Sequence, residues 1–174
     1  MRPERGCGSV IELNVHSILY SLLSRYRLVL LKEAAGERYL PIWIGTHEAE
    51  AIAMKLQGTA VPRPFTHDLL AGVIADLGGA VQYVLVNDLN SNTFYARIAI
   101  AHDGELQLID SRPSDAIALA VRASVPIFAD ESVMEKAGIV TSPDLRVTAP
   151  SKAAEDLDVF RDFVDTLDLE DLGD

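Results

Sequence analysis

The chain has 174 residues, 49% of them apolar, and a net charge of −11; this fits one domain of ordinary size with a proper core. A single cysteine excludes a disulfide framework and a cysteine-rich zinc site, and no apolar run reaches membrane-spanning length, so no membrane partner is expected. The acidic balance also excludes a broad basic surface for nucleic acid. Local arginines or a bound metal ion would have to hold any phosphate.

The N-terminal residues 1–9 are predicted to be a flexible leader outside the folded domain. They lack the apolar core of an export signal. Together with the lone cysteine, this favours a reducing compartment, and we expect the protein in the cytoplasm.

The periodicity of the next residues predicts alternating groups of strands and helices. Strands are expected at residues 10–19, 26–32, 38–44, 81–89, 93–101, 105–109 and 126–129, and helices at residues 47–57, 67–77, 113–121 and 131–137. Pro41 indicates an edge position or a bulge in its strand. Thr66 is the expected cap of the second helix, which carries an apolar stripe of Leu69, Val73, Leu77, Leu70 and Ile74. The pattern predicts an α+β domain over residues 10–140, with helices packed on a mostly antiparallel sheet.

Residues 141–174 are predicted to be a linker and an acidic amphipathic tail. From residue 153 onward there are nine acidic residues and one basic residue, a net of −8 out of the chain's −11, so the rest of the chain carries −3. Leu157, Phe160, Val164 and Leu167 recur at helical spacing. A short helix here would dock on the domain, which we favour, or would be offered to a partner.

A short internal sequence repeat indicates that the domain has two related halves. Residues 50–54 resemble residues 115–119, and each pair of helix and preceding strand follows a Gly-Glu turn. We therefore expect two related strand–turn–strand–helix units. Glu48 or Glu50 would then occupy a helix start comparable to that of Asp115, with both facing one cleft.

A polar turn between two apolar runs is the strongest local feature of the chain. Pro113 suits the first helical position and favours extended geometry at Arg112. Asp115 would then meet free N–H groups at the third helical position, near the positive end of the helix dipole. Two interpretations stay open: a helix cap with an Arg–Asp pair, or a binding or catalytic cluster at a helix N-terminus.

Other sequence motifs for catalysis are absent. There is no Walker loop, no dinucleotide fingerprint and no Cys–His nucleophile pair. His47 and Glu48 begin like a metalloprotease helix, but Ala51 stands where that motif requires its second histidine.

Three segments in this order and spacing resemble the bifunctional nuclease family: Tyr39-Leu-Pro-Ile-Trp-Ile-Gly45, Arg63-Pro-Phe-Thr-His-Asp-Leu69 and Asp110-Ser-Arg-Pro-Ser-Asp-Ala-Ile117. The resemblance runs from about residue 10 to about residue 138. It implies an α+β domain, a homodimer, and nuclease activity on DNA and RNA. The polar residues that match its motifs are Glu48, Arg63, His67, Asp68, Asp110, Arg112, Ser114 and Asp115.

We assign hypothetical roles to these residues from the needs of phosphodiester hydrolysis. The expected catalytic residues are His67, Asp68, Asp115 and Glu48, with His67 as the general base or acid. Arg112, Arg63 and Ser114 would bind the substrate, the two arginines by clamping phosphate. The carboxylates available for Mg²⁺ or Mn²⁺ are Asp110, Asp115, Asp68 and Glu48; no organic cofactor is expected.

Two classes of function remain open for this chain. The first is a metal-dependent nuclease acting on DNA or RNA. The second is a non-catalytic dimeric binding or regulatory module, which would use the same polar cleft for an anionic ligand or a protein partner, because a fold does not establish a reaction. Satisfaction of Asp115 by Arg112 and helix N–H groups alone would favour the second.

Overall fold

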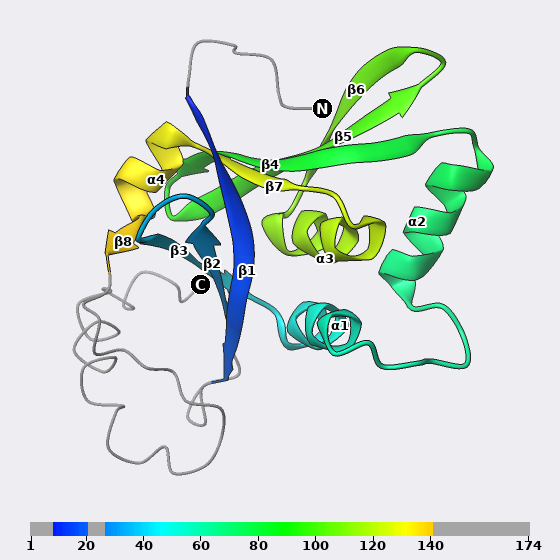
Figure 1. Ribbon diagram of the computed structural model, residues 1–174, viewed down its shortest axis with the longest axis horizontal. Coiled ribbons are helices and arrows are strands. Elements are labelled where there is room, and N and C mark those ends of the chain that lie inside the picture. Colours follow the sequence, from blue (N-terminus) through cyan, green and yellow to red (C-terminus); the bar gives the residue numbers. More distant parts are fainter. Residues whose placement is uncertain (1–8, 21–26, 141–174) are drawn as a thin grey trace. The chain divides into compact units, whose positions relative to one another are not determined.

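The computed structural model describes residues 9–20 and 27–140, which contain one mixed sheet and the helices packed on it (Figure 1). The strands are β1 (Val10–Tyr20), β2 (Arg27–Glu33), β3 (Arg38–Ile44), β4 (Ala80–Asn90), β5 (Thr93–His102), β6 (Glu105–Ser111), β7 (Ile127–Asp130) and β8 (Ile139–Val140). The helices are α1 (Thr46–Leu56), α2 (Thr66–Asp76), α3 (Pro113–Ala123) and α4 (Glu131–Ala137). The predicted α+β class is confirmed.

The described strands form a sheet in the order β6-β5-β4-β7-β1-β2-β3-β8. β7 pairs parallel to β4 and antiparallel to β1, whereas every other neighbouring pair is antiparallel. Pro41 pairs with Leu30 of β2, and on its other side β8 reaches only Arg38 and Tyr39. Among the residues that the structure describes, Pro41 therefore lies at an open edge, where its missing N–H costs no ladder hydrogen bond.

The sheet consists of two meanders, β1-β2-β3 and β4-β5-β6, joined through β7. In the first, β2, a turn and β3 lead into α1; in the second, β5, a turn and β6 lead into α3. This is the predicted pair of strand–turn–strand–helix units. The turn of the second unit is tight, because Asp103 and Gly104 both have positive φ, at 50° and 82°.

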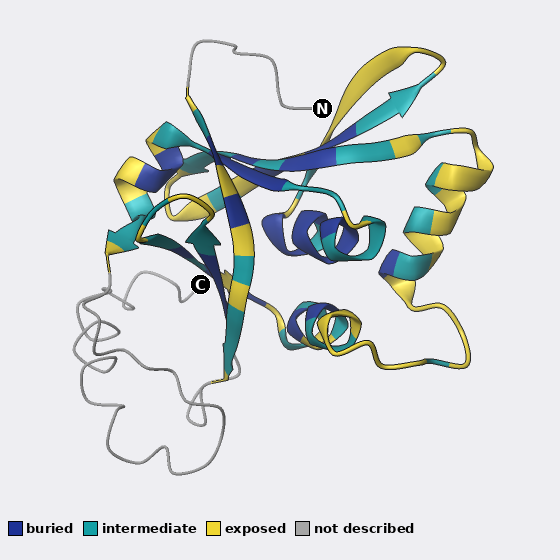
Figure 2. Cartoon of the chain, in the orientation of Figure 1, coloured by how far each residue is buried: buried dark blue, intermediate teal, exposed yellow. Residues whose placement is uncertain are grey.

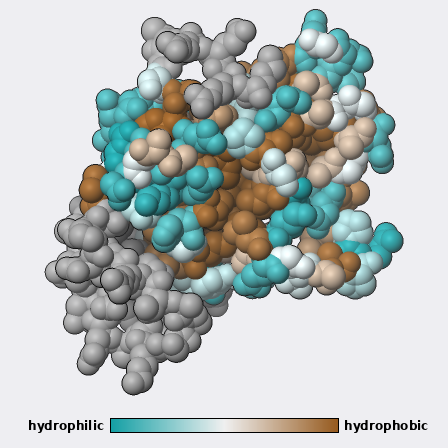
Figure 3. Space-filling view, in the orientation of Figure 1, coloured by the Kyte–Doolittle hydropathy of each residue, from teal (hydrophilic) through white to brown (hydrophobic). Residues whose placement is uncertain are grey.

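The main core lies on the face of the sheet that α1, α3 and α4 cover. Alternate residues of the strands β1 to β5 and β7 reach this core, such as Ile11 and Leu13 in β1 and Val84 and Val86 in β4, whereas β6 is exposed along nearly its whole length. α3 is the most deeply buried helix, with every residue from Ala116 to Ala120 at most 1% exposed (Figure 2). Around this core, apolar side chains gather across the middle of the face shown in Figure 3, within a rim of polar residues.

The start and the outer face of α2 differ from the prediction. Phe65, not Thr66, is the N-cap, and the Asp68 carboxylate accepts the Phe65 backbone N–H at 3.0 Å, so the acid at the third helical position does the capping. Most of the predicted apolar stripe faces outward, with Leu69 60% and Leu77 71% exposed, whereas Ile74 packs against the core. Figure 2 shows α2 mostly as exposed residues, at the far end of the sheet from α4.

The predicted leader lies outside the described residues except for Ser9, and the predicted tail helix with its apolar residues lies wholly outside them. β8 is a short strand that periodicity did not predict, because two residues carry no period. Within the described ranges, no helix is long and apolar enough to cross a membrane.

Candidate functional site

Each of the helices α1, α2 and α3 carries an acidic residue at its third position. These residues are Glu48, Asp68 and Asp115, following the N-caps Gly45, Phe65 and Arg112. A carboxylate in the first turn is stabilised by the helix dipole, which explains its presence locally but not its partners. The packing of α3 against both α1 and α2 brings the three helices together.

Arg112 joins the starts of α1 and α3. Pro113 holds it in extended geometry, with φ −68° and ψ 144°, as predicted. Its Nε and Nη2 donate to Oδ2 and Oδ1 of Asp115 at 2.7 and 3.2 Å, and Nη2 also donates to Oε1 of Glu48 at 2.9 Å. Gly45 leaves the room that Glu48 needs, because a Cβ at residue 45 would collide with its carboxylate.

His67 from α2 completes this group. Its Nε2 lies 2.9 Å from Oδ1 of Asp115, and its residue is only 8% exposed. The prediction that helix N–H groups bind the Asp115 carboxylate is wrong. The side chains of Arg112 and His67 bond to its two oxygens instead. Burial alone would raise the pKa of Asp115, but the hydrogen bonds and charges of Arg112 and His67 outweigh it and hold that pKa below its usual value.

The Arg112 guanidinium is both restrained and open. Its side chain is 67% exposed, whereas those of Glu48 and Asp115 are 18% and 28% exposed. Asp115 first, and Glu48 as well, raise the pKa of Arg112, so it stays charged. In the described part of the chain its Nη1 has no hydrogen-bond partner, and this N–H edge is available to an anion. We call Glu48, His67, Arg112 and Asp115 the dyad cluster.

A second ion pair lies beside the dyad cluster. The Arg122 side chain is only 4% exposed and donates from Nε to Oδ1 of Asp68 at 2.6 Å. It also donates to the carbonyl oxygens of Ala118 and Ala51, at 2.9 and 3.2 Å, so it ties α3 to α1 and α2. Burial opposes ionisation of Asp68, but the Phe65 N–H and Arg122 keep its pKa below the usual value.

Sequence reasoning missed Arg122 as a site residue. The signal was a charged residue that ends an apolar run, seven positions after Asp115 and hence on the same face of α3.

A hollow of about 310 Å³ opens next to the Asp68–Arg122 pair. We call it the α2 hollow. Its lining includes Lys55, Val61, Arg63, Phe65, Asp68 and Arg122. Arg63 therefore lies with Asp68, and no hydrogen bond joins it to Arg112.

The remaining predicted site residues are not drawn into the dyad cluster. Asp110 is exposed on β6, and Ser114 is buried at the second position of α3, 7% exposed. The structure gives neither side chain a hydrogen bond to Glu48, His67 or Arg112. Their predicted roles in metal and substrate binding stay predictions.

Three of the four carboxylates predicted to bind a metal ion are held by arginines, whereas Asp110 lies exposed on β6. Arg112 lies between Glu48 and Asp115, and Arg122 holds Asp68. Among the residues that the structure describes, no group of three His, Cys, Asp or Glu side chains is placed to hold one ion. The donor set does not fit a preformed metal site, so we derive no chemical step through a metal.

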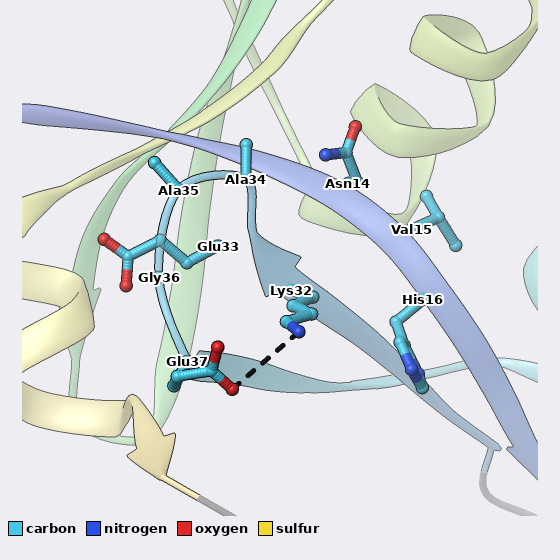
Figure 4. A pocket seen from close by; sticks show the side chains of 9 residues that line it. All are labelled: Asn14, Val15, His16, Lys32, Glu33, Ala34, Ala35, Gly36 and Glu37. Carbon is cyan, nitrogen blue, oxygen red and sulfur yellow. Dashed lines mark ion pairs between the residues drawn. The ribbon is translucent and has the colours of Figure 1, made fainter.

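A larger hollow, of about 560 Å³, lies between β1 and the β2–β3 turn (Figure 4). Lys32 and Glu37 approach each other across it at 3.9 Å. His16, predicted to face solvent, is exposed at its rim. None of the predicted site residues lines this hollow.

Comparison with known proteins is consistent with the expected family. The model of the bifunctional nuclease domain family matches residues 29–142. An uncharacterized protein of Mycobacterium tuberculosis is 41% identical over 145 residues, which is 83% of this chain and 87% of the relative. Bifunctional nuclease 1 of Oryza sativa subsp. indica is 26% identical over 117 residues, 66% of this chain and 35% of the relative. Bifunctional nuclease 1 of Arabidopsis thaliana is 23% identical over 133 residues, 75% of this chain and 41% of the relative.

Proposed function

The chain belongs to the bifunctional nuclease domain family, and on this premise we propose that it hydrolyses phosphodiester bonds of DNA or RNA at the dyad cluster. The observation that carries the proposal is the shared carboxylate of Asp115. It orients a buried histidine with one oxygen and restrains an exposed guanidinium with both.

The proposed mechanism uses His67 as the general base. If Nε2–H donates to Asp115, the other ring nitrogen, Nδ1, carries the lone pair that accepts a proton from the attacking water. The water oxygen bonds to phosphorus, the bond to the leaving oxygen breaks, and that oxygen takes up a proton. Histidine suits this role because it exchanges protons readily near neutral pH.

Arg112 is the proposed partner of the phosphoryl oxygens. Negative charge grows on these oxygens in the transition state, and a preorganised cation stabilises it without reorganising. Glu48 and Asp115 hold the guanidinium by hydrogen bonds of 2.9 and 2.7 Å, which leaves its open N–H edge for the substrate. Glu48 is thus a positioning residue in this mechanism.

The test is cleavage of labelled single- and double-stranded DNA and RNA, each with EDTA, Mg²⁺ or Mn²⁺. Asp115→Asn and His67→Ala should each lower the rate at least a hundredfold, because they remove the base or its orientation. His16→Ala and Asp76→Asn are matched controls at exposed positions outside the cluster, and they should cleave like wild type. Cleavage that survives in both cluster variants would contradict the proposal. The EDTA arm tests the predicted need for Mg²⁺ or Mn²⁺.

A non-catalytic binding module is the second candidate function. It is favoured by the pairing within the dyad cluster, because both Asp115 oxygens already bond to protein side chains. Under this alternative, wild type would bind an anionic ligand in a manner that depends on Arg112 and would cleave no nucleic acid under any of the metal conditions.

We also propose that the protein is a homodimer that uses the outer face of α2. Leu69, Leu70, Val73 and Leu77 are 60%, 38%, 44% and 71% exposed along one short helix. A cluster of large apolar residues on a surface typically marks an interaction site. A second copy would bring an identical face, so the two stripes could bury one another about a twofold axis.

A further inference from the structure

We propose that the α2 hollow binds a single-stranded segment of nucleic acid, with an unpaired base stacked on Phe65 and phosphates held by Lys55 and Arg63. The inference rests on the proposed function, because it names the substrate form that would reach the dyad cluster. It adds Lys55 and Phe65, which neither the family resemblance nor the catalytic proposal assigns.

The hollow and the dyad cluster share the first turn of α2. Phe65 is the N-cap and Asp68 the third residue of that helix, and both line the hollow. His67, between them in the chain, turns instead towards Asp115. A strand bound in the hollow would therefore lie next to the proposed general base.

The α2 hollow supplies positive charge that the dyad cluster lacks. In the dyad cluster, two carboxylates face one guanidinium, so Arg112 offers an open N–H edge while Glu48 and Asp115 already balance its charge. In the hollow, Asp68 pairs with Arg122, whereas Lys55 and Arg63 are exposed and make no ion pair within the described residues. The charge of Lys55 nevertheless helps to lower the pKa of Asp68. The hollow thus supplies two cations beside a site that needs positive charge.

The apolar side of the hollow suits a base rather than a bare phosphate. Phe65 is 41% exposed although it is a large aromatic residue, and Val61, Pro62 and Pro64 line the same hollow. Proteins that bind single strands combine such aromatic platforms with cations that follow the backbone. A base in a duplex is paired and already stacked, so it cannot use the platform. Single strands are therefore the expected ligand.

Binding can be measured without cleavage by fluorescence anisotropy of a labelled oligothymidylate on the His67→Gln chain. The measurement is repeated with wild type and a phosphorothioate-linked strand, in case the variant folds poorly. Phe65→Ala should weaken binding about tenfold, within the range of roughly 5- to 150-fold that one lost base stack implies. Tyr95→Ala, an aromatic residue on β5 with 42% exposure, is the matched control and should bind as its parent does.

The salt dependence of binding tests the roles of Lys55 and Arg63. Combined Lys55→Gln and Arg63→Gln should weaken binding and reduce the slope of log affinity against log salt by about 1.4, since each lost phosphate contact on a single strand contributes about 0.7. Lys136→Gln, at an exposed lysine of α4, is the control that should leave the slope unchanged. A duplex of the same length should bind more weakly than the single strand.

The outcomes separate this proposal from the proposed function. Tight single-strand binding that depends on Phe65, in a wild-type chain that never cleaves, would support the hollow and overturn the nuclease. Cleavage that depends on His67, with Phe65→Ala binding as tightly as its parent, would overturn the hollow alone. Absence of oligonucleotide binding, or equal binding of the duplex and the single strand, would also overturn it.

Discussion

At the scale of single residues, Asp115 is the point on which the site depends. Both its oxygens are engaged, at 2.9 Å with His67 and 2.7 Å with Arg112. Asp115→Asn keeps the shape but removes the charge, and we expect it to lower the free energy of unfolding by about 1–3 kcal/mol, because hydrogen bonds to charged groups are lost. Urea denaturation at neutral pH measures this, with Asp76→Asn as the exposed control. A change no larger than that of the control would contradict the observed pairing.

The lowered pKa of Asp115 gives that loss a pH dependence. The folded-state pKa lies below the unfolded value of about 3.9, so the carboxylate stabilises the fold above that value and loses its contribution as the pH falls through the folded pKa. The stability difference between wild type and Asp115→Asn should therefore be present at pH 5 and shrink below pH 4. Urea titrations at a series of pH values test this. A difference that stays constant down to pH 3 would be inconsistent with the pKa direction.

At the scale of elements, Arg122 couples three helices. It is 4% exposed and bonds to Asp68 of α2, to Ala51 of α1 and to its own helix. Arg122→Met removes the cation paired with Asp68 and leaves its carboxylate with the Phe65 N–H, and breaking such an ion pair costs roughly 3 kcal/mol. Adding Asp68→Asn to this variant should recover part of the loss, because it removes the stranded charge. Chemical denaturation of wild type, Arg122→Met, Asp68→Asn and the double variant forms a double-mutant cycle. If the two changes in the free energy of unfolding simply add, the residues are not directly coupled.

Local rules predicted the elements well where they depended on the chain alone. Pro113, Arg112 and Asp115 lie where turn and helix-start preferences place them, and the Gly-Glu turns revealed the two units. The rules failed where tertiary contacts decide. Phe65 displaced Thr66 as cap because Asp68 reaches back to its N–H. The apolar stripe of α2 gave no sign that most of it would be exposed while Ile74 packs against the core.

The site was predicted as a set of residue types rather than as a geometry. The sequence indicated that Glu48 or Glu50 shares one cleft with Asp115, and Glu48 is the residue that Arg112 joins to Asp115. It could not separate Arg63 and Asp68 from the dyad cluster, because that division depends on how α2 packs on α3. Arg122 was not predicted, because the local sequence does not distinguish a buried arginine at the end of an apolar helix from an exposed one. Its partners Asp68 and Ala51 are distant in the sequence.

At the scale of the whole molecule, the exposed face of α2 predicts self-association. Combined Leu69→Glu and Leu77→Glu would place charges on a face that a second copy must cover, and we expect a dimer to dissociate into chains of 18.9 kDa. Leu56→Glu, on α1 at 53% exposure, is the matched control that should leave the dimer intact. Sedimentation equilibrium measures the mass. A wild-type mass of one chain, or a dimer unaffected by the double change, would rule out this interface.

The acidic end of the chain is expected to act on nucleic acid through charge. Residues 153–174 carry a net −8, whereas the rest of the chain carries −3. If the tail competes with nucleic acid for the same cations, a chain that lacks residues 153–174 should bind single strands more tightly, with the largest gain at low salt. Unchanged affinity at every salt concentration would rule out this role.

The central claim is that His67, oriented by Asp115, performs the proton transfer of phosphodiester cleavage. Chemical rescue tests it most directly: His67→Ala is assayed on labelled single-stranded RNA and DNA with and without added imidazole. We predict that the variant is at least a hundredfold slower than wild type and that imidazole restores part of the rate in proportion to its concentration, with no effect on Asp76→Asn. Cleavage by His67→Ala at the wild-type rate without imidazole would contradict the claim.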